Sequence, residues 1–328
     1  MSGGDQAQTT EASVDRSLAV RTFVRRARAG ISLPFPGLGN TAERFRVLRA
    51  EAAADASVGR LFEAHADALA ISFEAGISAP LHSALAVWAS GSTASTCVEE
   101  TIDGSLLNGK RSFCGGASIV DAALMTTDSP EGERLVLIRL NQPGISVDTH
   151  TWRTEAFREA GVSTVYFDNV RIEADSIIGP PGWYGQREGF WFGAVGVASV
   201  WAGMADTLLA ALPVIRRKRD DVSRIANGTI QSSMWAVSAL LEEAARQLDE
   251  IRPIPDRRDR IRIAKSVALC TRQTVRSHLE DAMSAFDQEV GPGLMAFEKD
   301  LARLRIELSM SLGQAHGPRD LLVLTEDE

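Results

Sequence analysis

The spacing of hydrophobic residues changes twice along the chain. Residues 41–76 form an Ala-, Leu-, Glu- and Arg-rich stretch with an apolar side chain every three or four positions, which predicts two or three helices. Residues 83–182 instead contain short alternating or β-branched runs separated by turn pairs such as Asp103-Gly104, a pattern typical of an antiparallel barrel or sandwich. Helical stripes return from residue 189 and predict a four-helix bundle, with helices over 190–217, 226–251, 257–289 and 293–314.

This order of elements predicts an α+β fold with segregated layers. We expect a flexible N-terminus over residues 1–29, a helical domain over 30–82, a central β domain over 83–182 and a helical bundle over 183–328. The stretch 190–215 is long enough to span a bilayer and holds only one charge, Asp206. Because it is rich in Gly and Ala and no second hydrophobic segment follows, we expect a buried helix and no membrane partner.

The composition argues against several functions. The chain has 328 residues, of which 45% are hydrophobic and 24% charged, as in ordinary globular domains. Its formal net charge of -8 argues against a nucleic-acid partner, although a phosphate-bearing small molecule could bind where arginines converge. The three cysteines are far apart and lack CxxC spacing, which indicates a reducing, cytoplasmic compartment and neither a disulfide framework nor a metal site.

The segment LLNGKRSFCGGAS, residues 106–118, ends in small residues, including two that carry no side chain. Asn108-Gly109 predicts a hairpin turn, and the strand that follows finishes at two adjacent glycines, Gly115 and Gly116. Glycine lets a flat ring system approach the main chain closely, and backbone N–H groups can bind the heteroatoms of such a ring. The alternative is a β-bulge or loop that binds nothing.

Two segments are especially distinctive: DGSLLNGKRSFCGGASIVDAALMTT, residues 103–127, and GVSTVYFDNVRIEADSIIG, residues 161–179. The first is similar to the Asn-Gly hairpin and following strand of the acyl-CoA dehydrogenase family of flavoproteins, and the second resembles the last segment of that family's β domain. Weaker similarities at residues 55–69 and 288–304 extend the resemblance over nearly the whole chain from about Gly37. It implies FAD-dependent oxidation of the Cα–Cβ bond of an acyl thioester such as acyl-CoA, an electron-accepting flavoprotein partner, and a homodimer or homotetramer.

The resemblance also implies which residues contact FAD. Trp88 and Ser90 belong to the strand that gives main-chain contacts to the pyrimidine edge of the flavin, although Trp88 could equally be a core aromatic. Phe113 would flank the ring, Cys114 would follow it on the same strand, and Gly115 stands where relatives place Thr or Ser. That departure removes a hydroxyl contact and affects the tuning of the flavin rather than its binding.

A neighbouring subunit is implied at the other end of the cofactor. In relatives an Arg and a Gln reach the pyrophosphate and adenine of FAD, and Arg219 and Gln231 are the nearest equivalents here. A solvated charge run is the alternative. Gly291 and Gly293 resemble a glycine turn that meets the FAD of a partner subunit, but a Gly-x-Gly can also simply end a helix.

The catalytic base of the family has no clear counterpart. Relatives remove the α-proton with a Glu at the start of the long apolar helix, where this chain has Gly193, or in a loop before the last helix, where no Glu occurs. Glu188 and Glu307 are near in sequence but do not fit the motif. His316 in that loop and His65 in the first helical block are candidate bases, since imidazole titrates near neutral pH. A structural histidine is the alternative for each.

Two other functions therefore remain open. Flavin monooxygenases of this fold take reduced flavin from a partner reductase, and the pair His65 and His316 resembles the histidines found there. A non-catalytic subunit, in a heteromer with a homologous dehydrogenase, would also account for the missing Glu and for Gly115. The aromatic residues of FWFG, residues 190–193, together with Trp201 predict a crowded acyl pocket that admits only short chains.

Overall fold

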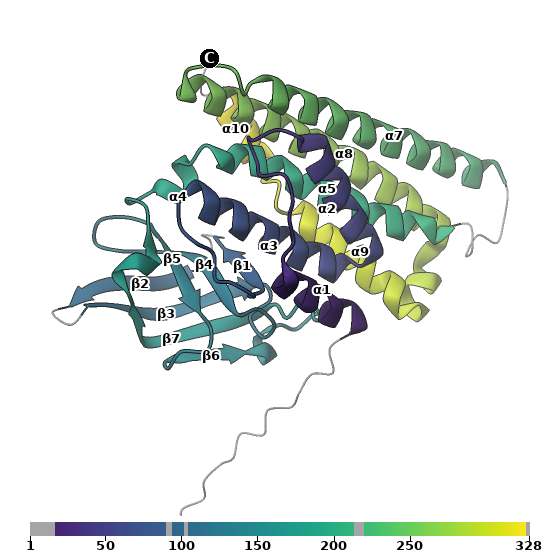
Figure 1. Ribbon diagram of the computed structural model, residues 1–328. Helices are drawn as coiled ribbons and strands as arrows, with labels where there is room; N and C mark the ends of the chain where they lie inside the picture. Colours follow the sequence, from purple (N-terminus) through teal and green to yellow (C-terminus); the bar gives the residue numbers. More distant parts are fainter. Residues whose placement is uncertain (1–16, 90–93, 102–103, 213–219, 326–328) are drawn as a thin grey trace, which may run out of the picture.

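The computed structural model describes residues 17–89, 94–101, 104–212 and 220–325, and it places a β domain beside a large helical part (Figure 1). This arrangement confirms the α+β fold class. The helices that precede the strands are α1 (Leu18–Ala29), α2 (Thr41–Ala54) and α3 (Ala56–Glu74). Those that follow the strands are α4 (Trp183–Gln186), α5 (Gly189–Ala210), α7 (Asp221–Glu250), α8 (Arg257–Phe297), α9 (Lys299–Leu312) and α10 (Pro318–Thr325).

Helix α1 corrects the expectation of a flexible N-terminus, set over residues 1–29, for the part from Ser17 that the structure describes. The range Leu18–Ala29 is helical, and the Ser17 side chain caps it by accepting a hydrogen bond from the backbone N–H of Val20. The expectation rested on the many polar residues of this stretch. Its apolar residues nevertheless recur at helical spacing, which gives α1 one face buried in the core, formed by Val20, Phe23 and Ala27.

The β domain contains two four-stranded sheets, ordered β1-β4-β5-β8 and β2-β3-β7-β6. Neighbouring strands are antiparallel, as expected, except that β1 and β4 run parallel. Helix α3 packs against β1, and every residue of β4 is buried. The strands are β1 (Leu85–Trp88), β2 (Ala94–Thr101), β3 (Gly104–Cys114), β4 (Ala122–Thr127), β5 (Arg134–Arg139), β6 (Ile145–Asp148), β7 (Ser163–Ile172) and β8 (Ile177–Ile178).

The expected hairpin turn at Asn108-Gly109 is wrong, because both residues lie inside β3. Strands β2 and β3 pair without interruption as far as Thr101↔Gly104. Between Leu107 and Gly109 the register of β3 against β7 shifts, and the extra residue lies on β7, so β7 bulges opposite this site. A Cβ atom on Gly109 would lie 1.9 Å from the carbonyl oxygen of Ser95, and the residue has a φ of +115°, so glycine is required here for both reasons.

Helix α5 is the buried apolar helix expected over residues 190–215. Among the described helices, it is the one long and apolar enough to cross a membrane, and 78% of its most apolar window is buried inside the protein. Its small residues allow close packing, since a Cβ atom on Gly203 would lie 2.1 Å from the backbone oxygen of Arg49 on α2. The single acidic residue of α5, Asp206, pairs with the same Arg49 at 2.7 Å.

The last long helices have other boundaries than expected. Helix α8 continues to Phe297 with a break at Gly291, where φ is 66° and ψ is 170°, and Pro292 follows. Helix α9 then begins at Lys299 instead of near residue 293. Gly291 therefore marks a helix boundary where one was expected, between residues 289 and 293, and a second break before Lys299 divides the expected last helix.

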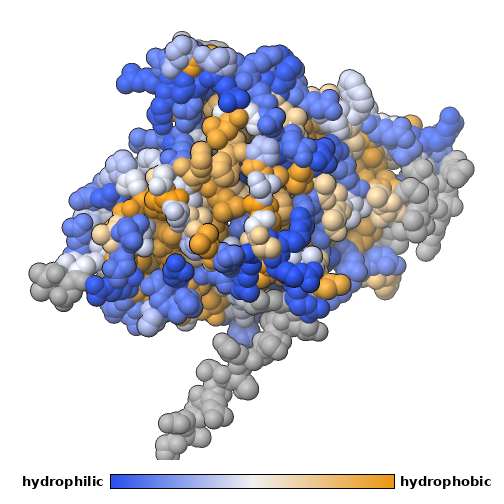
Figure 2. All heavy atoms as spheres, viewed as in Figure 1, coloured by the Kyte–Doolittle hydropathy of each residue, from blue (hydrophilic) through white to orange (hydrophobic). Residues whose placement is uncertain are grey.

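The segment that joins α1 to α2 covers the beginning of α5. The ring of Phe35 packs against that of Phe73 on α3, with centroids 4.8 Å apart. Pro36 lies 3.7 Å from the position that a Cβ atom on Gly193 would take. Apolar residues gather across the middle of the face shown in Figure 2, where this segment passes in front of α3 and α5 in Figure 1, and hydrophilic residues surround them.

Candidate functional site

The end of β1 meets the segment after β3 at the place where the sequence predicts a flavin. Trp88 is 3% exposed and thus a core aromatic, yet its indole Nε1 also donates to the backbone oxygen of Gly115 at 2.9 Å. This bond fixes the main chain beyond β3 against β1. A Cβ atom on Gly115 would meet nothing within 4 Å, so this side of the backbone faces open space. Ser90 lies outside the described residues.

The neighbouring glycine is required for packing. Gly116 has a φ of +75°, and a Cβ atom there would lie 2.9 Å from Cγ1 of Val120 and 3.1 Å from Cδ2 of Leu61. Its backbone N–H donates to the backbone oxygen of Ala160 at 2.8 Å. Of the two glycines, only Gly115 leaves room for a ligand. Gly116 is required by the packing and by the backbone conformation of this segment.

Phe113 and Cys114 point in opposite directions. Phe113 has a φ of 59° and is 55% exposed, and its ring meets that of Trp152 edge to face, with centroids 5.5 Å apart. Cys114 is fully buried, its thiol donates to the backbone oxygen of Arg111 at 3.3 Å, and burial raises the pKa of the thiol to about 12. Phe113 is therefore available to flank a ring, whereas Cys114 could contact a ligand only through its backbone.

His65 belongs to α3, and its side chain lies in the core beside α1 and β1. It is 1% exposed, and its ring packs edge to face with Phe23 at 6.1 Å. Its Nδ1 accepts the backbone N–H of Leu85 at 3.1 Å, which leaves the proton on Nε2, a buried atom with no hydrogen-bond partner. Desolvation lowers the pKa of His65 to about 4, so the imidazole is neutral at pH 7.

His316 has a different environment. It precedes α10, its side chain is 63% exposed, and its Nδ1 lies 3.5 Å from the carboxylate of Asp320. The same carboxylate accepts the backbone N–H of His316 at 2.9 Å and so stabilises the start of α10. Within the described residues, the structure does not bring His316 and His65 into contact, because one lies on the surface and the other in the core.

Neither position for a family-like base holds an available carboxylate in the described chain. Gly193, at the first position, faces Pro36. Glu188 pairs with Arg260 at 2.9 Å. Glu307 is fully buried, accepts the backbone N–H of Phe157 at 2.9 Å and pairs with an arginine on its own helix, while burial raises the pKa of its carboxyl.

Sequence reasoning missed a group of buried charges on α2 and α3. Glu63 is 7% exposed and pairs with Arg60 at 2.5 Å, while burial raises the pKa of the Glu63 carboxyl. Arg44 is 2% exposed and pairs with Asp67 at 2.6 Å. Glu63 and Asp67 are four residues apart on an apolar helix and so share one face, which was the available signal. A buried carboxyl with a raised pKa, such as that of Glu63, is a candidate for proton transfer or a polar ligand contact.

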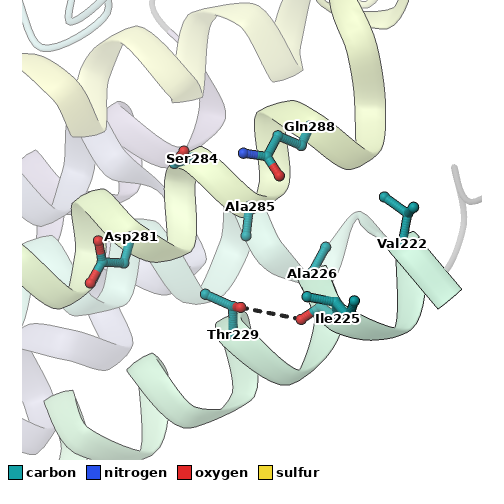
Figure 3. A pocket seen from close by; sticks show the side chains of 8 residues that line it. All are labelled: Val222, Ile225, Ala226, Thr229, Asp281, Ser284, Ala285 and Gln288. Atoms are coloured by element: carbon teal, nitrogen blue, oxygen red, sulfur yellow. Dashed lines mark hydrogen bonds between the residues drawn. The ribbon is translucent and has the colours of Figure 1, made fainter.

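Three of the four residues expected to reach a partner's FAD lie on α7 and α8. Gln231 is exposed on α7, and a Cβ atom on Gly291 or Gly293 would meet nothing within 4 Å. Arg219 lies outside the described residues. The same two helices line a groove of about 290 Å³, shown in Figure 3. The side chains labelled there are Val222, Ile225, Ala226, Thr229, Asp281, Ser284, Ala285 and Gln288.

Comparison with known proteins finds similarity in structure only. No family model matches the chain, and no curated protein matches it. A nitrososynthase from Micromonospora carbonacea var. africana aligns with a TM-score of 0.76 and 16% identity, over 92% of this chain and 86% of that one. KijD3 in complex with FMN and a dTDP-linked amino keto sugar aligns with a TM-score of 0.73 and 19% identity, over 94% and 93% of the chains. TdsC from Paenibacillus sp. A11-2, a dibenzothiophene monooxygenase, aligns with a TM-score of 0.68 and 17% identity, over 93% and 94%.

These neighbours are flavin enzymes with the acyl-CoA dehydrogenase fold, and this chain has that fold as well. The fold expected from the sequence is thereby confirmed. At identities of 16%, 17% and 19%, the likeness establishes the arrangement of the chain, and the chemistry has to be argued from the site residues.

Proposed function

We propose that this protein is a flavin-dependent monooxygenase that takes reduced FMN from a separate reductase and oxygenates a small substrate. The observation that carries this proposal is the lack of an available carboxylate, in the described chain, at both positions where dehydrogenases of this fold keep their base. Gly193 faces Pro36 at the first position. Glu307, the glutamate nearest in sequence to the second, is occupied by the N–H of Phe157 and by Arg303, and the carboxylate of Asp320 is occupied by the backbone N–H of His316.

The two histidines are poor replacements for that base. Removal of an α-proton needs a base within about 2.6–3.2 Å of the proton it takes and a pKa near the working pH. His65 has a pKa of about 4 and is enclosed in the core. His316 is largely exposed and paired with Asp320. Oxygenation by reduced flavin does not begin with α-proton removal, so it is compatible with these residues.

The residues at Gly115 fit a flavin ring. Open space beside a backbone that carries no side chain suits a wide planar group, and exposed main-chain groups can bind its heteroatoms. Trp88 would hold the Gly115 carbonyl in place, and Phe113 would pack against the edge of the ring. When bound, the flavin supplies the redox chemistry and the reaction with oxygen.

FMN takes the place of the FAD expected from the sequence. The structures of TdsC and KijD3 that resemble this chain are complexes with FMN, and TdsC is described as a monooxygenase. For the same reason, the substrate that we propose is a small molecule that is not an acyl-CoA. The proposed redox partner is likewise a flavin reductase instead of an electron-accepting flavoprotein.

The test compares two ways of using the flavin. Purified protein is first titrated with oxidised FMN and with photoreduced FMN under anaerobic conditions, and binding is followed by absorbance and flavin fluorescence. We expect reduced FMN to bind at least as tightly as oxidised FMN, and its reoxidation by oxygen to follow a different rate from that of free FMN. The flavin-loaded protein is then mixed anaerobically with a panel of acyl-CoAs, and we expect none of them to bleach it.

Two outcomes would overturn the proposal in different directions. Bleaching by an acyl-CoA would establish a dehydrogenase, and the base would then be sought with His316→Asn and Glu63→Gln. Failure to bind FMN in either redox state, by a protein that co-purifies with a homologue, would favour the non-catalytic subunit.

A further inference from the structure

A second concave site lies beside Phe113 on the outer face of the sheet β2-β3-β7-β6. It is a cavity of about 300 Å³ at the junction of β3, β7 and the short 3-10 turn at Thr149–Thr151. Its lining combines three aromatic side chains, one of them a phenol, with four aliphatic hydroxyl groups and one ammonium group. The residues are Phe113, Trp152, Tyr166, Ser112, Thr151, Ser163, Thr164 and Lys110.

The pleat of the sheet brings Lys110, Ser112, Thr164 and Tyr166 to one face. Lys110 pairs with Tyr166 across β3 and β7, and both are exposed, whereas the next pair, Arg111 and Val165, is buried on the opposite face. The register of β3 shifts again between Arg111 and Cys114, which is a second bulge. Together with the positive φ of Phe113, it turns the aromatic ring out of the strand.

The aromatic part of the cavity suits a planar ligand. The rings of Phe113 and Trp152 meet at an interplanar angle of 84°, so they form a corner with one ring face and one ring edge. Tyr166, which is 39% exposed, adds a third ring. The hydroxyl groups of Ser112 and Thr164 lie 3.1 Å apart and can orient together toward polar atoms of a ligand.

Lys110 supplies the charge. It forms no ion pair with any residue of the described chain, and the protein as a whole carries a net charge of -8. An ammonium group without a carboxylate partner, beside aromatic rings and hydroxyls, is suited to bind a phosphate. A cavity of about 300 Å³ is at the small end of ligand sites, so it fits one ring system with its phosphate and not a dinucleotide.

We propose that this cavity binds a phosphorylated aromatic heterocycle, with the ring against Phe113 and Trp152 and the phosphate at Lys110. The assignment rests on the proposed function in part, because Phe113 is shared with the flavin site. One source of this chemistry is FMN, whose ring and phosphate are parts of the same molecule. The other is a nucleotide group attached to the substrate.

The experiment uses matched pairs of ligands that differ only in phosphate. Binding of FMN, riboflavin, thymidine monophosphate and thymidine to the full chain is measured by calorimetry and by quenching of tryptophan fluorescence. The variants are Lys110→Gln and Trp152→Leu, and Lys299→Gln removes the same charge from α9 as a control. We expect the phosphorylated member of one pair to bind about tenfold more tightly, and Lys110→Gln to abolish that difference.

The two pairs of ligands distinguish FMN from a substrate nucleotide as the molecule that binds in the cavity. They also distinguish this inference from the proposed function. A phosphate preference that depends on Lys110 for FMN alone assigns the cavity to the flavin, and the same result for thymidine monophosphate alone assigns it to a substrate nucleotide. In the second case the inference stands even where FMN does not bind. FMN binding that is equal in wild type, Lys110→Gln and Trp152→Leu, with no binding of thymidine monophosphate, overturns the inference and leaves the proposed function intact.

Discussion

Replacing each of the two adjacent glycines by alanine should have opposite effects on stability. At Gly116 the new methyl group would meet Val120 at 2.9 Å and Leu61 at 3.1 Å, and the backbone has a φ of +75°. At Gly115 the methyl group would enter open space, and the backbone lies outside the left-handed region. The pair is thus a matched comparison, because both changes add one methyl group to neighbouring positions.

The expected difference follows from three contributions. Alanine in the left-handed region costs about 1–2 kcal/mol. Overpacking of a filled site costs about 1–3 kcal/mol. Restriction of the unfolded chain offsets about 0.4–1 kcal/mol of this. We therefore expect Gly116→Ala to lower the free energy of unfolding by about 2–3 kcal/mol, and Gly115→Ala to raise it by about 0.5 kcal/mol through the last contribution alone.

Urea denaturation followed by far-UV circular dichroism measures both values, with the slope m as a check that the transition itself is unchanged. If the two variants lose the same stability, the distinction between the glycines is refuted, and Gly115 is a packing residue like Gly116. A third variant, Gly115→Ser, adds the hydroxyl that relatives carry. It should keep wild-type stability and shift the midpoint potential of bound FMN, since a new hydrogen bond would act on the ring.

Three further changes test the surroundings of the site. His65 has a folded pKa of about 4, below its unfolded value of about 6.5, so its contribution to stability is complete above pH 6.5 and is lost as the pH falls toward 4. Between pH 7.5 and pH 5 wild type should lose about 2 kcal/mol that His65→Gln does not lose, and parallel pH profiles in urea denaturation would count against a buried neutral imidazole. Arg44→Gln should destabilise by about 3 kcal/mol because it removes a buried guanidinium that pairs with the half-buried carboxylate of Asp67, whereas Arg46→Gln, at an exposed pair, should cost under about 1 kcal/mol; equal midpoints would contradict the burial of Arg44. Trp88→Phe should cost about 1 kcal/mol by removing the bond to the Gly115 carbonyl, and should weaken FMN binding; unchanged FMN affinity would separate this bond from the flavin site.

The strand pairing at Gly109 illustrates where a local sequence signal fails to predict the structure. Asn-Gly is a strong signal for a two-residue turn, but β3 has a partner strand on each side, β2 at Thr96 and β7 at Phe167. The pairing on both sides keeps the chain extended, and the glycine is needed because the Ser95 oxygen approaches it. Neither neighbour can be identified from residues 106–118 alone.

Some residues of the candidate site can likewise be identified from the sequence, and others only from the structure. Trp88, Phe113 and Gly115 could be selected from the sequence because they lie on two recognisable segments, and the structure joins the ends of those segments by a hydrogen bond between Trp88 and Gly115. The cavity at Lys110 could not be selected, since Trp152 reaches it from a loop that carries no motif. Histidines 65 and 316 looked equivalent as candidate bases, although one is enclosed and the other exposed.

The order of helices and strands and the burial of α5 can be predicted from the sequence, because periods of about 3.6 and 2 and the run of apolar residues are properties of consecutive positions. Only the folded chain shows that residues 18–29 form a helix with one buried face, that the buried Arg44 pairs with Asp67, and that Gly115 is open while Gly116 is filled. Burial, pairing and free space at a residue depend on atoms from distant parts of the chain, and those atoms come together only when the chain folds.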